Sequence, residues 1–330
     1  MAGSDAVLRG AESRKTAYPG ARYPEAKIVD IQRMSTEDGP GLRTTVFFKG
    51  CNLACPWCHN PETINRKSDL IWFSAKCMGC NICVGVCPQK GISRGEKGIR
   101  FNRSICEACG SCAENCPKGA IEMKGMLIPV DRLAGELAKD KAYFGAGGGV
   151  TLSGGEALLQ EEAAQELARL LKAEGIHTAL DTAGCYDFGR LETILPHIDM
   201  VLYDIKIFDG DAHKRFTGAD NSPILRNYRR LMEMGTRVWV RTPVIEGATD
   251  GEENITAIGK FIAAAGLPEK WELCAFNNLC RDQYERLDRN WTYGETRLTE
   301  KTRIEKLTEI AARYFPGAVY TGAVADNAGG

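Results

Sequence analysis

Several absences narrow the possibilities. The chain of 330 residues has a formal net charge of −1, so no broad basic surface for nucleic acid or an anionic membrane is expected. It has no run of about 18 apolar residues, so no membrane-spanning helix is predicted. Residues 1–25 lack the apolar core of a signal peptide and are predicted to form a polar tail. These features favour a cytoplasmic protein that binds neither nucleic acid nor membrane.

Cysteine, in contrast, is abundant. The chain has 14 cysteines, and without an export signal disulfides are disfavoured against metal or cluster binding. Eleven of the 14 lie between Cys51 and Cys116. Such clustering along the chain predicts metal-cluster chemistry in this region. Cys185, Cys274 and Cys280 fit no ligand pattern and are expected to be small buried thiols.

The first group of cysteines is Cys51-x3-Cys55-x2-Cys58. A [4Fe–4S] cube takes four ligands, so three cysteines leave one iron atom open to a substrate. A structural zinc site would need a fourth cysteine or histidine nearby. His59 follows Cys58 directly, and adjacent residues rarely chelate one ion together. The group therefore predicts a cluster with one open coordination position.

Two further runs have the spacing of bacterial ferredoxins, in which the fourth cysteine of each run binds the cluster of the other run. Residues 71–122 are accordingly predicted to be a ferredoxin-like insert that needs its two clusters to fold. The clusters could be structural staples or an electron relay, since both roles need the same ligands. The predicted ligand sets are Cys77, Cys80, Cys83 and Cys116 for one cluster, and Cys106, Cys109, Cys112 and Cys87 for the other.

Outside the insert, short apolar segments alternate with amphipathic helical ones, such as Leu158–Ala173. This repetition predicts right-handed βαβ units and a parallel sheet, with a spacing of about 25–35 residues that suits a barrel. The expected class is α/β, with one domain over residues 26–330 that contains the insert. The candidate strands are Thr44–Lys49, Gly149–Leu152, His177–Asp181, Met200–Lys206, Arg237–Thr242 and Trp271–Phe276.

Polar side chains follow the carboxyl ends of these strands, where parallel barrels have their active sites. Asp204 and Lys206 are two residues apart and share one strand face with Leu202. A buried Asp–Lys pair without a ligand is costly, which favours a functional pair over a surface ion pair. Gly154-Gly155-Glu156 opens a helix and could hold the polar groups of an amino acid, or could be a simple glycine-rich turn. The remaining residues of this rim are Cys51, Asp181, Thr182 and Arg241.

Taken together, these motifs resemble those of the glycyl-radical-enzyme activating enzymes, which belong to the radical S-adenosylmethionine (radical SAM) superfamily. The resemblance extends over about residues 26–276. The ferredoxin-like insert resembles the longer members of the family. The matching stretches are Asp38-Gly39-Pro40-Gly41-Leu42-Arg43, the Cys51 group with His59-Asn60-Pro61-Glu62-Thr63, Gly147–Gln160, Leu180–Gly184, Asp204-Ile205-Lys206, and Val240-Arg241-Thr242-Pro243.

The resemblance implies a partial (β/α)6 barrel in which Cys51, Cys55 and Cys58 hold a [4Fe–4S] cluster and SAM binds the open iron. It implies that Gly154, Gly155 and Glu156 contact the SAM amino end, and that Lys206 and Arg241 bind its carboxylate or neighbouring polar atoms. Backbone near Trp57 and His59 would pack on the adenine. Asp38 would help to receive a partner peptide. A monovalent-cation site is implied at Asp181, Thr182 and Asp204, together with the carbonyl of Leu202.

The implied activity is that of an oxidoreductase. The reduced cluster cleaves SAM to methionine and a 5′-deoxyadenosyl radical, which takes a hydrogen atom from a glycine Cα of a partner glycyl radical enzyme. An electron donor such as flavodoxin or ferredoxin is expected, and the activating enzyme is expected to be a monomer. No general acid or base is needed, which agrees with a chain that has only four histidines.

Two other activities stay open at this stage. One is a radical SAM enzyme that acts on a small molecule or a peptide, and the other is a pure iron–sulfur electron-transfer protein. The second leaves the Cys51 group and the rim residues unexplained. One departure from the family is Asn277, which stands where relatives often have a histidine of a Leu-Pro-Tyr-His-like segment, so a role in SAM binding is not expected there.

Overall fold

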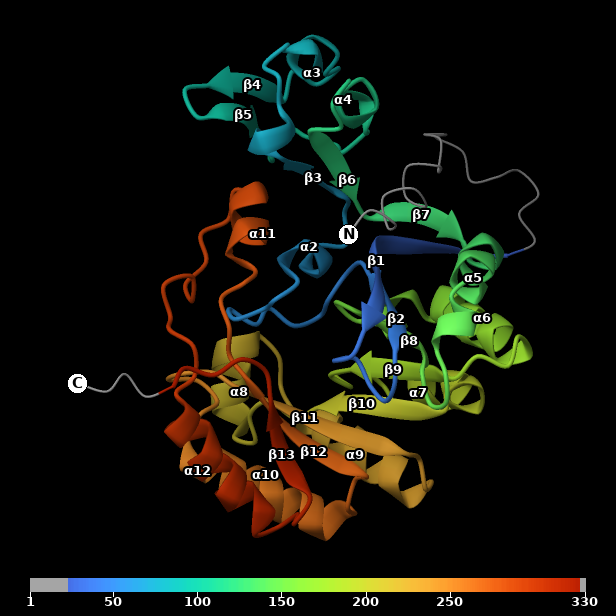
Figure 1. Cartoon of the computed structure of the whole chain (residues 1–330), viewed down its shortest axis with the longest axis vertical. Helices are drawn as coiled ribbons and strands as arrows, with labels where there is room; N and C mark the ends of the chain where they lie inside the picture. The colour runs from blue at the N-terminus through green and yellow to red at the C-terminus, as the bar shows by residue number, and fades with distance from the viewer. Residues whose placement is uncertain (1–22, 327–330) are drawn as a thin grey trace.

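The computed structural model describes residues 23–326, and Figure 1 shows a central sheet with the predicted insert projecting from one end. The sheet has nine strands in the order β13-β12-β11-β10-β9-β8-β2-β1-β7. All six predicted strands are present and run parallel, and a seventh, β13, extends them. They are β2 (Arg43–Phe48), β8 (Gly149–Gly154), β9 (Thr178–Thr182), β10 (Met200–Asp204), β11 (Val238–Val244), β12 (Lys270–Ala275) and β13 (Ala318–Thr321).

Helices pack on the outer face of this sheet. Val201 and Tyr203 of β10 belong to the large core between strands and helices, whereas Leu202 packs on the inner face with Ala179 and Met200. The predicted alternation along β10 is therefore confirmed. In the described part of the chain no helix has the length and apolar content needed to cross a bilayer. The covering helices are α5 (Val130–Ala138), α6 (Glu161–Ala173), α7 (Gly189–Ile194), α9 (Ser222–Glu233), α10 (Glu252–Ala265) and α12 (Lys301–Ala312).

Two strands at one edge of the sheet were not predicted. β1 (Glu25–Ser35) pairs antiparallel with both β2 and β7 (Met126–Pro129). A register shift between Ile28 and Asp30 breaks the alternation of β1, which hides a strand whose Ile28, Val29 and Ile31 are all buried. Residues 1–22 of the predicted tail lie outside the described residues, and its last residue, Glu25, begins β1.

The residues predicted to form the insert fold as a small unit with its own apolar cluster. Its base is an antiparallel pair of β3 (Asp69–Trp72) and β6 (Ile121–Lys124). A hairpin of β4 (Ile92–Gly95) and β5 (Gly98–Phe101) and two short helices, α3 (Ile82–Gly85) and α4 (Ser111–Glu114), complete it. The apolar cluster of this unit consists of Leu70, Ile92, Ile99, Phe101 and Ile121, and the buried cysteines Cys83 and Cys112 lie among them.

Lys49 connects this unit to the sheet. It follows β2, and its buried ammonium donates to the Asp69 carboxylate at 2.8 Å and to the carbonyl of Glu62 at 2.6 Å. Gly125, between β6 and β7, packs directly on the Lys49 side chain. A Cβ at this position would be only 2.2 Å from Cδ of Lys49, so the close contact requires a glycine. The chain therefore enters and leaves the insert side by side over one buried ion pair.

We predict that Lys49→Met lowers the free energy of unfolding by about 3–5 kcal/mol, because it leaves the nearly buried Asp69 carboxylate unpaired. Lys49→Met combined with Asp69→Asn should recover part of the loss. Anaerobic chemical denaturation followed by tryptophan fluorescence measures both. Lys260→Met, at an exposed lysine of α10, is the matched control. An equal, small effect of Lys49→Met and Lys260→Met contradicts the prediction.

Candidate active site

A pocket of about 1120 Å³, part of it open to solvent, lies at the carboxyl ends of the parallel strands. Its position is the one predicted from the rim residues. Apart from the carbonyl of Leu202, thirteen residues are predicted to hold the cluster, SAM or the monovalent cation. Twelve of the thirteen line the pocket, and Glu156 is the one that does not. The twelve are Cys51, Cys55, Trp57, Cys58, His59, Gly154, Gly155, Asp181, Thr182, Asp204, Lys206 and Arg241.

The three cysteines of the first group lie on the loop between β2 and α2 (Pro61–Ile64). Burial raises the pKa of the Cys51 thiol to about 12, and it also raises the pKa values of Cys55 and Cys58. An isolated thiolate is therefore unfavourable here at neutral pH. Bound iron would supply the compensating positive charge, since metal ligation and thiol deprotonation are coupled. The donor set thus suits a cluster.

Two charged pairs line the pocket on neighbouring strands. The Lys206 ammonium donates to the Asp204 carboxylate. Burial opposes the charge of Lys206, but the neighbouring carboxylates of Asp204 and Asp181 outweigh it and keep its pKa above the ordinary value. Nη1 of Arg241 lies 3.8 Å from Oδ1 of Asp181. Lys206 and Arg241 therefore stay cationic, which is what recognition of a carboxylate requires.

Asp181 is the carboxylate most affected by this environment. Burial raises its pKa to about 6, with Arg241 opposing the shift. The hydroxyl of Ser153, from the end of β8, donates to its Oδ2 at 2.7 Å. β9 and β10 thus bring Asp181 and Asp204 to one edge of the sheet, as their positions in the sequence predicted.

The Gly154-Gly155 turn is shaped by close packing. A Cβ at Gly154 would lie 2.3 Å from the backbone nitrogen of Phe48, and one at Gly155 would lie 2.3 Å from the carbonyl oxygen of Gly50. The amides of Gly155 and Glu156 donate to Phe48 and Gly50 at 3.0 and 2.8 Å. The turn is therefore held directly against the loop that carries the cysteines.

Glu156 lies behind the pocket wall. Its Oε2 accepts the Thr182 hydroxyl at 2.7 Å, and its Oε1 accepts the amide of Leu158 at 3.3 Å. The side chain begins a short 3-10 turn, Ala157–Gln160, ahead of α6. The Glu156 side chain therefore supports Thr182, and its contact with the SAM amino end stays a prediction.

Trp57 and His59 form the apolar side of the pocket. Trp57 is buried in a cluster with Ile207, Ile245 and Phe276. The His59 ring lies 5.8 Å from the Phe276 ring, and burial lowers its pKa, so it is neutral at pH 7. Cys274 also lines the pocket. It is half-buried, as is Cys185, so among the three thiols expected to be buried only Cys280 is fully so.

The Asp38-Gly39-Pro40-Gly41 loop borders the pocket next to Arg241. The Asp38 carboxylate accepts the hydroxyls of Ser35 at 2.6 Å and Thr45 at 2.7 Å. Nη2 of Arg241 donates to the carbonyl of Glu37 at 3.3 Å. Asp38 therefore holds its own loop in shape, and Arg241 connects this loop to the charged residues of the pocket.

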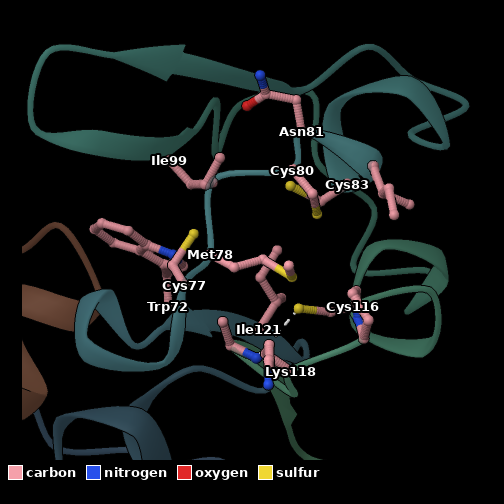
Figure 2. A pocket seen from close by; sticks show the side chains of 13 residues that line it. Trp72, Cys77, Met78, Cys80, Asn81, Cys83, Ile99, Cys116, Lys118 and Ile121 are labelled. Carbon is pink, nitrogen blue, oxygen red and sulfur yellow. Dashed lines mark hydrogen bonds between the residues drawn. The ribbon is translucent and has the colours of Figure 1, made fainter.

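A second hollow, of about 350 Å³ and partly open to solvent, lies in the insert. Figure 2 shows Cys77, Cys80, Cys83 and Cys116 around it, the set predicted from spacing to share one cluster. In the described residues, no three His, Cys, Asp or Glu side chains are arranged as ligands of a single metal ion.

The two cysteine runs of the insert share one local pattern. The amide of Gly91 donates to Sγ of Cys87 at 3.2 Å, and the amide of Ala120 donates to Sγ of Cys116 at the same distance. Each sulfur accepts a hydrogen bond from the amide four residues further along the chain.

The second predicted ligand set of the insert consists of Cys87, Cys106, Cys109 and Cys112. Burial raises the pKa of Cys112 to about 12.

Comparison with known proteins adds an independent line of evidence. Residues 45–257 match the family model described as the radical SAM superfamily. The chain belongs to this superfamily. A radical SAM methyltransferase of Sphaerobacter thermophilus has a similar fold, with a TM-score of 0.51 at 14% identity over 91% of this chain and 70% of the other.

Curated relatives narrow the assignment to the glycyl-radical-enzyme activating enzymes. The trans-4-hydroxy-L-proline dehydratase activating enzyme of Clostridioides difficile is 36% identical over 86% of this chain and 95% of its own length. The benzylsuccinate synthase activating enzyme of Thauera aromatica is 36% identical over 86% of this chain and 88% of its own length. The family expected from the motifs is confirmed.

We predict that, in the absence of SAM, the free energy of unfolding decreases less with rising pH in Glu156→Gln than in the unaltered chain. Burial raises the pKa of Glu156 from 4.5 to about 7, so between these values the folded chain keeps a proton that the unfolded chain has lost. Stability therefore falls as pH rises through this window, by up to about 3 kcal/mol from this group. Unfolding midpoints at pH 5 and pH 8 measure the slope, and identical slopes for variant and unaltered chain contradict the prediction.

Proposed function

We propose that the chain activates a partner glycyl radical enzyme. When bound, the reduced [4Fe–4S] cluster and SAM supply the chemistry, in which SAM is cleaved to methionine and a 5′-deoxyadenosyl radical that takes a glycine Cα hydrogen atom of the partner. The observation that carries the proposal is the meeting of Cys51, Cys55 and Cys58 with Lys206 and Arg241 in one pocket. This oxidoreductase assignment agrees with the family of the chain.

Different residues of the pocket would bind different parts of the cluster and of SAM. Cys51, Cys55 and Cys58 would hold the cluster and leave one iron for SAM. The permanent charges of Lys206 and Arg241 suit the SAM carboxylate. The Gly154-Gly155 backbone, which has no side chain to intervene, suits its amino end. Neutral His59 and buried Trp57 suit the uncharged adenine.

A monovalent-cation site at Asp181, Thr182 and Asp204, with the carbonyl of Leu202, is part of the same proposal. Both carboxylates line the pocket. They are also among the groups that raise the pKa of Lys206. A bound cation would offset part of the negative charge of the two carboxylates and would lower the pKa of Asp181 towards its ordinary value.

We propose that residues 26–330 form one domain and that 71–122 is a two-cluster insert within it, which brings the total to three clusters. The grouping of four cysteines around one hollow supports the first insert cluster. A low-potential donor such as flavodoxin or ferredoxin would deliver the electron. We further propose that the chain works as a cytoplasmic monomer.

The glycyl radical enzyme that this chain activates would be a separate protein. The Asp38 loop is the proposed receptor of its glycine-bearing peptide, because it borders the pocket and is braced by Arg241. Dehydratases, decarboxylases, a synthase and sulfite-lyases appear among the proteins named with the curated relatives. These classes are the first partners to test.

We predict that Cys55→Ala abolishes the formation of 5′-deoxyadenosine from SAM and dithionite. The substitution removes a ligand of the proposed SAM-binding cluster, and about four of roughly twelve iron atoms per chain should be lost. Cys80→Ala, in the insert, should lose a similar amount of iron but only slow the reaction. Iron analysis and chromatography of anaerobic samples measure both effects.

Product in the Cys55→Ala variant at the level of the unaltered chain would overturn the radical SAM assignment of this site. Activation itself is tested by electron paramagnetic resonance of a co-incubated glycyl radical enzyme, which should show the doublet of a glycyl radical. Formation of 5′-deoxyadenosine without this doublet for any partner class would favour a small-molecule or peptide substrate.

A further inference from the structure

The chain after β12 passes over the cysteine loop, and its side chains donate hydrogen bonds to backbone carbonyls of residues 56–61. We call residues 277–294 the bridge segment. The Tyr284 hydroxyl of α11 (Arg281–Arg286) donates to the carbonyl of Cys58 at 2.9 Å. The Trp291 indole donates to the carbonyl of Pro56 at 2.9 Å, and the Arg289 guanidinium to that of Pro61 at 3.0 Å. Three side chains of one segment thus bind two carbonyls of the cysteine loop and the carbonyl of Pro61, the first residue of α2.

Apolar packing makes these donors rigid. The rings of Tyr284 and Trp291 are stacked, with centroids 4.9 Å apart and planes 10° from parallel. Both belong to the apolar cluster that contains Trp57. Cys280 is buried in the same cluster, with Sγ 3.8 Å from the carbonyl of Cys58. The donors therefore have little freedom to leave the loop.

The other side of the bridge segment is bound to the insert. Arg103, which follows β5, donates to the carboxylate of Asp288 at 3.0 Å and to the carbonyl of Arg286 at 3.2 Å. It also donates to the carbonyl of Leu70 in β3 at 2.7 Å. The Arg286 guanidinium lies over the ring of Phe73, 4.7 Å from its centroid. In Figure 1, α11 lies beside α2 and below the insert.

We propose that Tyr284 and Trp291 are positioning residues for the cluster at Cys51, Cys55 and Cys58, and that the bridge segment fixes this cluster's loop relative to the insert. The inference rests on the proposed function in one respect, which is that a cluster occupies these three cysteines. Both donors bind backbone carbonyls and not cysteine sulfurs, but the positive ends of their O–H and N–H dipoles point towards the ligand loop. They therefore favour the more negative, reduced cluster and fix the orientation of its ligands.

The first test is an anaerobic redox titration of Tyr284→Phe, followed by electron paramagnetic resonance with and without SAM. At a fixed potential the ratio of reduced to oxidised SAM-responsive cluster should fall about two- to tenfold, as for the loss of one hydrogen bond. Trp291→Phe should act in the same direction. The insert clusters should titrate as in the unaltered chain, which also shows that the variants have folded.

Tyr293→Phe is the matched control for this test. Tyr293 lies in the same segment and packs on Trp57 with ring centroids 6.3 Å apart, but among the described residues its hydroxyl makes no hydrogen bond. An unaltered chain without a SAM-responsive cluster overturns the proposed function and this inference together. A SAM-responsive cluster that titrates identically in the unaltered chain, Tyr284→Phe, Trp291→Phe and Tyr293→Phe overturns this inference alone.

The second contact of the bridge segment is tested by hydrogen exchange of the cluster-loaded protein. Arg103→Gln should increase the exchange rate of amides in residues 281–291 at least several-fold, because it removes the anchor at Asp288 and Arg286. Arg100→Gln, at an exposed arginine of β5, is the control. Equal exchange in the two variants contradicts the connection between insert and segment.

Discussion

The structure depends most on one electrostatic constraint, the burial of three thiols in a pocket that also contains two carboxylates. Burial and negative neighbours both oppose a thiolate, and the pKa of Cys51 is accordingly raised to about 12. Bound iron would relieve this constraint, so cluster assembly and completion of the pocket would be one event. Lys206 and Arg241 stay protonated and limit the negative charge around the ligands.

The fold creates this pocket by bringing segments that are distant in the sequence to the carboxyl ends of the parallel strands. β2 delivers the cysteine loop, β8 the glycine turn, and β9 to β11 the charged side chains. Behind them, Glu156 accepts a hydrogen bond from Thr182. Lys49 donates to the carbonyl of Glu62 in α2 and to the carboxylate of Asp69 at the start of the insert. Few of these supporting groups touch the pocket, yet they determine where its residues point.

Much of this arrangement could be predicted from the sequence, because the cluster ligands and the parallel strands leave local patterns. Cysteine spacing identified Cys77, Cys80, Cys83 and Cys116 as one set, and these four line one hollow. β1 escaped prediction because a register shift breaks its alternation. The hydrogen bond between Glu156 and Thr182 was not predicted, because a carboxylate after two glycines suits ligand binding as well as support of a neighbouring strand. Tyr284 and Trp291 were missed because hydrogen bonds across 226 and 235 residues leave no periodic signal.

The central claim is that the three-cysteine cluster has an open iron that binds SAM. Electron–nuclear double resonance of the reduced protein with SAM labelled with 15N at its amino group tests it most directly. The account predicts a 15N hyperfine coupling to the cluster, which disappears in Cys55→Ala and persists in Cys80→Ala. A fully loaded protein that binds labelled SAM without any such coupling would contradict the account.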